Sequence, residues 1–235
     1  MTLTLRALAR LLGYPDASLR AALDEVRAAL HAERVLSAPS LAAVDALIDW
    51  IGSRPPLEIE AAYVETFDRG RATALHLFEH VHGDSRDRGP AMIDLIRTYD
   101  AAGLSLAEGE LPDHLPVLLE FASTQPPPQA HEFLGETVHI LQAIYAALYT
   151  RRSPYAAALA AVIELAGERA RTPDAAPVPQ PDAGLDQSWQ EPPAFDGCAG
   201  PSPAQRLQPG EPQPIQITRR PVAVNGVAHV ERAEP

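Results

Sequence analysis

The sequence predicts an all-α fold. A single globular multi-helix bundle over residues 1–172 is followed by a Pro-rich, largely disordered C-terminal tail over residues 173–235. Before the tail, apolar residues recur at helical spacing and no segment alternates with a period of two. More than half of the 24 prolines lie from Pro173 onward, where too few apolar residues remain to offset the backbone entropy lost on folding.

Three antiparallel helices are predicted at the start of the chain. The first ends at Gly13, because a glycine closely followed by a proline terminates a helix. Asp16 is predicted to cap the second helix and Ser40 the third. Their buried faces are predicted from the stripes Leu5, Leu8 and Leu12; Leu19, Leu23, Val26 and Leu30; and Leu41, Val44, Ile48 and Ile51.

In the middle of the chain, the sequence pattern predicts four helices. They cover residues 57–67 and about 74–81, then restart at Pro90 after a polar loop, and restart again after Asp113, which we expect to cap the following helix. The side chains expected to face inward are Ile59, Tyr63 and Phe67; Met92, Leu95, Ile96 and Tyr99; and Leu115, Leu118, Leu119 and Phe121.

The last two helices follow the breaker at residues 126–128. The longer one covers about residues 130–149, and the second begins at Ser153-Pro154 and extends to about Arg171. About eight or nine helices are therefore expected. In the tail, two islands, SWQEPPAF and IQITRRPVAVNGVAHV, interrupt the Pro-rich sequence and are candidates for docking onto a partner.

Composition excludes several classes of function. The net charge of -12 disfavours a nucleic-acid partner, because an acidic chain repels phosphate backbones. No apolar run approaches the roughly 20 residues that span a bilayer, so we expect neither direct membrane insertion nor a cleavable signal. The one cysteine, Cys198, has no internal partner, which fits a reducing compartment and a cytoplasmic location.

The run HLFEH, residues 76–80, has the H-x-x-E-H spacing of one class of zinc peptidases. In those enzymes two histidines face the same way on a helix and the glutamate serves as base. The structural alternative is that His76 and His80 are partly buried and bond to carboxylates or backbone. A binding role in which His80 or His82 lines a groove also remains open. A zinc site would need a third protein ligand, for which the candidates are Glu108, Glu110 and Glu120.

The run GDSRDRG, residues 83–89, has alternating charge and a glycine at each end. Its simplest interpretation is a solvated loop held by local Arg–Asp pairs, each contributing about 0 to 1 kcal/mol. Nucleophile elbows, phosphate-binding loops, dinucleotide fingerprints and C-x-x-C pairs do not occur in the sequence. The sequence therefore offers no serine, cysteine or glycine-loop chemistry.

The chain resembles the respiratory nitrate reductase delta subunit family, the NarJ-type molybdenum cofactor assembly chaperones. Three segments carry the resemblance: YVETFDRGRATALHLFEHVHGDSRDRGPAMIDLIRTY, LPDHLPVLLEF and the tail island WQEPPAF. It extends over roughly residues 8–195 and is strongest over residues 63–121.

The resemblance implies a cytoplasmic, all-helical chaperone in the wider group that binds twin-arginine leader peptides of redox enzymes. It thereby implies a protein that is not an enzyme and has no bound cofactor of its own. Its expected partners are the N-terminal peptide of the apo nitrate reductase alpha subunit and the alpha-beta complex. The complex would be held ready for insertion of molybdenum cofactor and iron-sulfur clusters before membrane docking. Molybdenum cofactor biosynthesis proteins are candidate partners.

The resemblance also implies positions for a peptide site. The wider group's leader-binding motif falls on Asp113 and His114, followed by Leu115 and Pro116. The narrower signature falls on His76, Glu79, His80, Asp84, Arg86 and Arg88, whose individual roles do not follow from the match.

An amphipathic peptide could lay its apolar face in a groove whose acidic rim attracts basic residues. The rim would be formed by Glu79, Asp84, Glu110, Asp113 and Glu120, and part of the floor by Leu115, Leu119 and Phe121. Two hypotheses from other classes are a zinc-dependent hydrolase built on the H-x-x-E-H run and a helical adaptor that binds through its tail.

Overall fold

The computed structural model describes residues 1–83 and 85–173, and within these ranges the chain is all-α, as predicted. Ten α-helices and one 3-10 helix occur there, and no strand. The first five helices are α1 (Thr2–Leu12), α2 (Ala17–Ala21), α3 (Leu23–Glu33), α4 (Ala38–Ser53) and α5 (Pro56–Phe67). They are followed by the 3-10 helix η1 (Arg71–Thr73), α6 (Leu77–Val81), α7 (Arg88–Ala101), α8 (Leu115–Thr124), α9 (Pro127–Thr150) and α10 (Ala156–Leu165).

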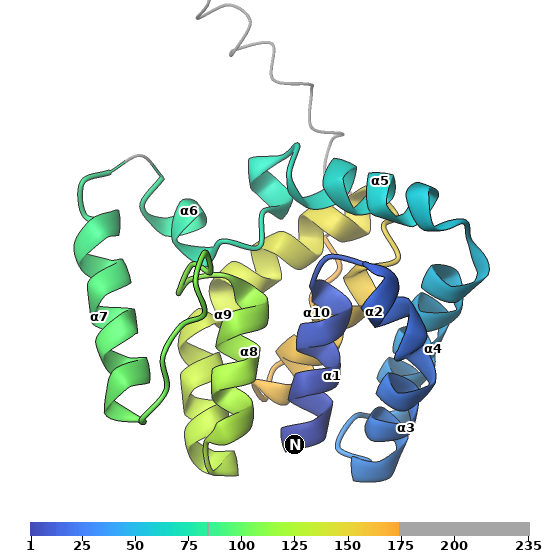
Figure 1. Cartoon of the computed structure of the whole chain (residues 1–235), viewed down its shortest axis with the longest axis horizontal. Helices are drawn as coiled ribbons and strands as arrows, with labels where there is room; N and C mark the ends of the chain where they lie inside the picture. Colours follow the sequence, from blue (N-terminus) through green and yellow to red (C-terminus); the bar gives the residue numbers. More distant parts are fainter. Residues whose placement is uncertain (84, 174–235) are drawn as a thin grey trace, which may run out of the picture. The chain divides into compact units, whose positions relative to one another are not determined.

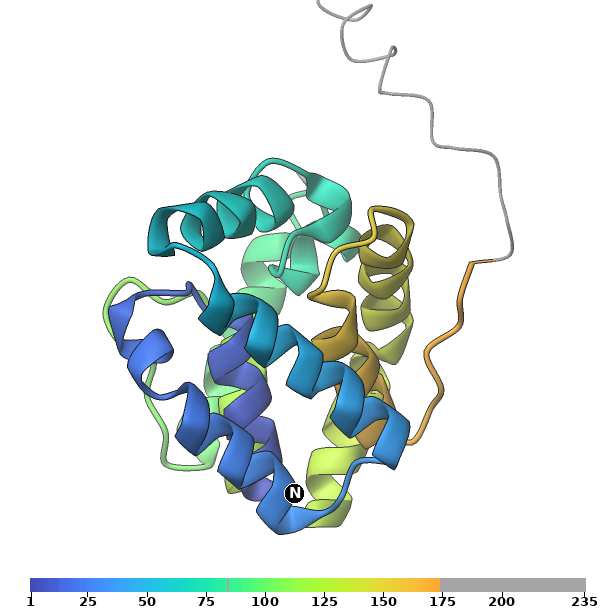
Figure 2. The same cartoon turned by 90° about the vertical axis from the view of Figure 1, so that its right-hand side faces the viewer.

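Helix α1 lies in the middle of the bundle and packs against α8, α3 and α10 (Figure 1). Its leucines at positions 5, 8, 11 and 12 are all 0% exposed, which extends the predicted stripe to a second face of the helix. Helix α10 packs against both α9 and α4, and Figure 2 shows α5 crossing one end of these helices. The core of the bundle is therefore built around α1 and α10.

The structure confirms one of the helix caps predicted for the start of the chain and places another differently. Asp16 caps α2 as expected, because its carboxylate accepts from the Leu19 amide at 2.8 Å. The predicted second helix is divided between α2 and α3 at Ala22, which raises the helix count. The third predicted helix, α4, is capped by Ser37 rather than Ser40, since Pro39 is tolerated in the first turn and the Ser37 hydroxyl accepts from the Ser40 amide.

The helix predicted over residues 74–81 begins only at Leu77. The residues before it pair with the segment that precedes α8. The Leu77 amide donates to the Asp113 carbonyl at 3.0 Å, and the Leu115 amide donates to the Leu75 carbonyl at 2.8 Å. Residues His76 and His114 thus form an isolated antiparallel β-bridge. This long-range pairing takes the backbone of residues 75 and 76 out of the helix.

Helix α7 is the largest departure from the prediction, because of the four residues expected to face inward only Tyr99 is buried. Met92 and Leu95 are half-buried, and Ile96 is 36% exposed. Figure 1 shows α7 at one edge of the bundle, and its principal helical neighbour is the short α6. The apolar stripe is present in the sequence, but no large helix packs against it.

The last helix, α10, ends at Leu165 instead of continuing to about Arg171. Gly167 has the left-handed conformation (φ 82°), which stops the helix. The predicted tail, its two islands and Cys198 lie outside the described residues, so the boundary at residues 172/173 stays a prediction. Across residues 1–83 and 85–173, no helix has the length and apolar character needed to cross a membrane.

Candidate functional site

The β-bridge brings the two most distinctive sequence segments into contact at the residues singled out from the sequence. His76 and His114 stack with ring centroids 4.9 Å apart. Asp113 lies between them and α6, and Glu79 and Arg88 complete the group. We call these five residues, His76, Glu79, Arg88, Asp113 and His114, the polar cluster.

Asp113 is the buried centre of the polar cluster, with 0% of its surface exposed. It was expected to cap its own helix, α8, but its Oδ2 instead accepts from the Phe78 amide in the first turn of α6, at 3.1 Å. The same oxygen is 3.7 Å from the Arg88 guanidinium. Asp113 therefore caps a helix that lies 35 residues earlier in the chain.

The two histidines of the cluster differ in their electrostatic environment. The Asp113 carboxylate, with Oδ1 3.5 Å from Nδ1 of His76, raises the pKa of His76, against the opposing effect of burial. This separation is long for a hydrogen bond, so we regard the contact as mainly electrostatic. Burial, followed by the charge of His76, lowers the pKa of His114. The first proton taken up by the pair therefore resides on His76.

Metal binding by the H-x-x-E-H run required both histidines on one face of a helix, and this premise is wrong. His76 precedes α6 in an extended conformation, and its ring faces Asp113 and His114. The ring of His80 bonds through Nε2 to the Ala74 carbonyl at 2.8 Å. Among the described residues, no group of three or more His, Cys, Asp or Glu side chains is placed to hold a metal ion.

The polar loop between α6 and α7 is anchored by ion pairs to residues outside the loop as well as by hydrogen bonds within it. Arg88 reaches the Glu79 carboxylate at 3.4 Å and Asp113 at 3.7 Å, so its ion pairs leave the loop rather than staying within it. Arg86 is exposed, and Asp84 lies outside the described residues. Of the two described loop residues that were predicted to belong to the site, Arg86 and Arg88, the fold brings Arg88 to the cluster.

Helix α8 presents two different faces. Leu115 and Leu119 are 0% exposed and Pro116 is buried, so these predicted site residues contribute to the core and not to an open surface. The opposite face, with Val117, Glu120, Phe121 and Thr124, lines a cavity of about 480 Å³ that is open to solvent. Of the predicted rim and floor residues, Glu120 and Phe121 lie at this cavity.

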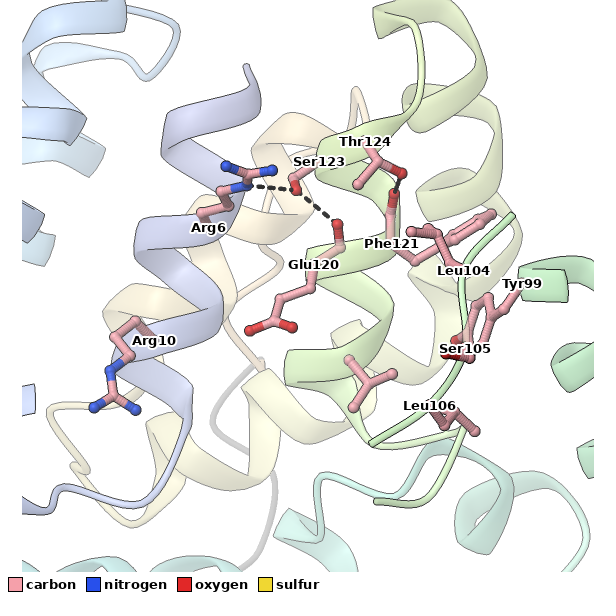
Figure 3. Close-up of a pocket in the computed structure, with 11 residues that line it drawn as sticks. Arg6, Arg10, Tyr99, Leu104, Ser105, Leu106, Glu120, Phe121, Ser123 and Thr124 are labelled. Atoms are coloured by element: carbon pink, nitrogen blue, oxygen red, sulfur yellow. Dashed lines mark hydrogen bonds between the residues drawn. The ribbon is translucent and has the colours of Figure 1, made fainter. Parts of the chain in front are cut away.

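We call this cavity the α1–α8 pocket (Figure 3). Arg6 and Arg10 approach it from α1, and the guanidinium of Arg6 donates to the Ser123 hydroxyl at 3.2 Å. The other wall is formed by Tyr99 and residues 104–106 of the loop after α7. Sequence reasoning did not assign Arg6, Arg10 or Leu104 to a site. The sequence feature that could have indicated this wall of the pocket is the pair of arginines four residues apart in a helix that is otherwise mainly apolar.

Tyr99 connects the pocket with the polar cluster. Its ring lies 4.7 Å from the ring of Phe121, at the pocket, and its hydroxyl donates to the Pro112 carbonyl at 2.8 Å. Pro112 immediately precedes Asp113. Burial raises the pKa of Tyr99, so this hydroxyl keeps its proton and remains a donor. One side chain thus contacts both a wall of the pocket and the residue that precedes Asp113.

Comparison with known proteins shows which sequences this chain is similar to. The chain is 44% identical over 157 residues to the nitrate reductase molybdenum cofactor assembly chaperone NarJ of Escherichia coli K12, covering 67% of this chain and 66% of that protein. It is 48% identical over 113 residues to the probable nitrate reductase molybdenum cofactor assembly chaperone NarW of the same strain, covering 48% and 49%. The matches thus span less than two thirds of either relative.

A solved structure supports the fold alone. The crystal structure of a candidate redox enzyme maturation protein from Archaeoglobus fulgidus superimposes with a TM-score of 0.50 at 17% identity, covering 72% of this chain and 94% of that one.

The family model described as nitrate reductase delta subunit matches residues 16–161, which include the polar cluster and all of α8. The chain belongs to the nitrate reductase delta subunit family.

Proposed function

We propose that the protein is a system-specific assembly chaperone, not an enzyme, that binds the N-terminal segment of the apo nitrate reductase alpha subunit. In the cytoplasm it holds the alpha-beta complex ready for insertion of molybdenum cofactor and iron-sulfur clusters before membrane docking. The observation that carries the proposal is the solvent-open, partly apolar α1–α8 pocket in a chain of this family.

The pocket suits one turn of an amphipathic peptide helix. Its volume of about 480 Å³ is within the usual range for small binding sites, and aromatic and aliphatic side chains form its floor and loop wall. Glu120 is exposed at the edge and available to a basic residue of the peptide. Apolar burial would supply the affinity, and the charged edge would select the orientation.

The polar cluster acts in this proposal mainly by positioning. Asp113 is fully buried, so its effect on a peptide is transmitted through α6, Pro112 and Tyr99 rather than by direct contact. His114 retains 22% of its side-chain surface and Glu110 retains 49%, and both are accessible to a ligand. Of the acidic residues predicted for the site, Glu120 lines the α1–α8 pocket and is the proposed direct contact. His114 and Glu110 lie outside the pocket lining and would meet only a peptide that extends beyond it.

Calorimetric titration with a synthetic peptide of the alpha subunit's N-terminal segment tests the proposal. The wild-type chain is expected to bind. Leu104→Asp places a charge on the loop wall of the pocket and should weaken binding at least tenfold, about 1.4 kcal/mol. Leu104 is 36% exposed, so the fold should tolerate the change.

The matched control is Leu57→Asp on α5, where the leucine is 78% exposed and does not line the α1–α8 pocket. This variant should bind the peptide as the wild type does. Absence of binding by the wild-type chain would refute the chaperone proposal. Equal weakening by both substitutions would remove the pocket from it.

A further inference from the structure

A second solvent-open cavity, of about 540 Å³, lies at the turn between α9 and α10. Three arginines line it: Arg69 follows α5, and Arg151 and Arg152 form the turn. Trp50 of α4 contributes an aromatic wall, and Ser153 a hydroxyl. We call these five residues the arginine pocket. None of them lines the α1–α8 pocket.

The charge at the arginine pocket opposes that of the whole protein. One carboxylate, Glu65, lines the cavity and pairs with Arg69 at 3.1 Å. Among the described residues, neither Arg151 nor Arg152 forms an ion pair within 4.0 Å. Two uncompensated guanidinium groups thus share one cavity in a chain of net charge -12. An anionic ligand would supply the missing countercharge.

The guanidinium of Arg151 lies close to the backbone at Gly70. A Cβ atom at residue 70 would lie 3.0 Å from Nη2 of Arg151 and 3.3 Å from its Nη1. The absence of a side chain at Gly70 therefore lets the Arg151 guanidinium lie close against the backbone beside Arg69.

The turn itself does not require an arginine at position 152. Arg152 has a left-handed backbone (φ 53°), which glycine adopts at lower cost. The turn is closed by backbone bonds from the Arg152 amide to the Tyr149 carbonyl and from the Ser153 amide to the Leu148 carbonyl. The Arg152 side chain therefore takes no part in the bonds that close the turn, and it lines the cavity.

We propose that the arginine pocket binds the diphosphate group of a small molecule. Guanidinium forks match phosphate oxygens two at a time, and several of them spread over one cavity suit a diphosphate better than a single carboxylate. The cavity volume is that of a small-molecule site rather than an extended protein interface. The half-buried Trp50 ring lies at the cavity, and the Arg54 guanidinium is 5.3 Å from its centroid. A nucleobase that replaces Arg54 on this ring would give a nucleoside diphosphate additional affinity over inorganic pyrophosphate.

Calorimetry on the full chain at low ionic strength tests this proposal with inorganic pyrophosphate and with ADP as probes. Both should bind, and added salt should weaken both. Arg151→Gln and Arg152→Gly should each weaken both probes at least tenfold. Trp50→Leu should weaken ADP and leave pyrophosphate unchanged, which distinguishes a nucleotide site from a plain diphosphate site.

Two controls separate loss of binding from loss of fold. Arg152→Gly relieves the left-handed strain, so its thermal midpoint should equal or exceed that of the wild type. Arg97→Gln removes one charge from the exposed surface of α7 and should leave both affinities unchanged. The proposal is overturned if neither probe binds the wild-type chain, if Arg97→Gln weakens binding as much as Arg151→Gln, or if an acidic peptide displaces pyrophosphate at lower concentration.

Discussion

Helices α7 and α8 follow each other in the chain and show similar apolar spacing, yet they are stabilised in different ways. In α8, Leu115 and Leu119 are 0% exposed in the core and Phe121 packs at the α1–α8 pocket. In α7, Ile93 is 52% exposed and only Tyr99 is buried. One helix is therefore held by apolar burial, and the other is not.

Two polar contacts, one near each end, take the place of packing in α7. At its start Arg88 reaches Glu79 and Asp113, and near its end the Tyr99 hydroxyl donates to Pro112. A helix held in this way can shift at small cost in free energy, because few buried apolar contacts have to be broken. The difference suggests that α8 fixes the site while α7 adjusts around a ligand.

The largest expected effect is on the free energy of unfolding, measured by urea denaturation. Leu119→Ala should lower it by about 2 to 5 kcal/mol, because a fully buried side chain is lost and a cavity remains. The matched change in α7, Ile93→Ala, should alter it by no more than about 0.5 kcal/mol. Equal losses would show that α7 is packed as α8 is.

Removal of the buried carboxylate should come next. Asp113→Ala leaves the Phe78 amide and the Arg88 guanidinium without their shared partner, and should lower the free energy of unfolding by about 1 to 3 kcal/mol. Amide hydrogen exchange in α6 and α7 should accelerate while α8 stays protected. The control is Asp94→Ala, whose pair with Arg97 is exposed and contributes about 0 to 1 kcal/mol. Similar exchange rates in both variants would contradict the tethering role of Asp113.

The second contact of α7 is tested by Tyr99→Phe. The ring keeps its packing on Phe121, but the bond to the Pro112 carbonyl is lost, at a cost of about 0.5 to 1.5 kcal/mol in unfolding free energy. Peptide affinity should change with it, since Tyr99 connects cluster and pocket. Tyr149→Phe, at a tyrosine that is 47% exposed on α9, should change neither quantity.

The smallest effect concerns pH. Asp113 raises the pKa of His76 above the ordinary value of 6.5, so the resulting stability is fully present below pH 6.5 and is lost as pH rises through the folded-state pKa. His114, with a lowered pKa, has the opposite sign: its contribution is present above pH 6.5 and is lost as pH falls through its folded-state pKa.

His76→Gln isolates the first of these contributions. The difference in unfolding free energy between wild type and variant, measured by urea denaturation at several pH values, should be largest in the acidic range and shrink toward alkaline pH. A difference that is constant with pH would show that His76 acts by packing alone.

The local sequence pattern was sufficient to predict which residues are buried or cap a helix wherever neighbours along the chain decide this. The stripe of α1, the Asp16 cap and the buried face of α5 were all predicted correctly. The stripe of α7 was misread because spacing identifies an apolar face but not whether another helix covers it. Asp113 was assigned to α8 because a capping residue normally precedes its own helix.

The sequence by itself determined that the described chain is helical, where most helices lie, and to which family the chain belongs. Helical periodicity and capping depend on residues close together in the chain, so they can be read locally. Only the tertiary structure decided that Asp113 caps α6, that His76 stacks on His114, and that Arg6 and Arg10 approach the pocket of α8. These contacts join residues separated by 35 or more positions, and their formation depends on how the whole bundle packs.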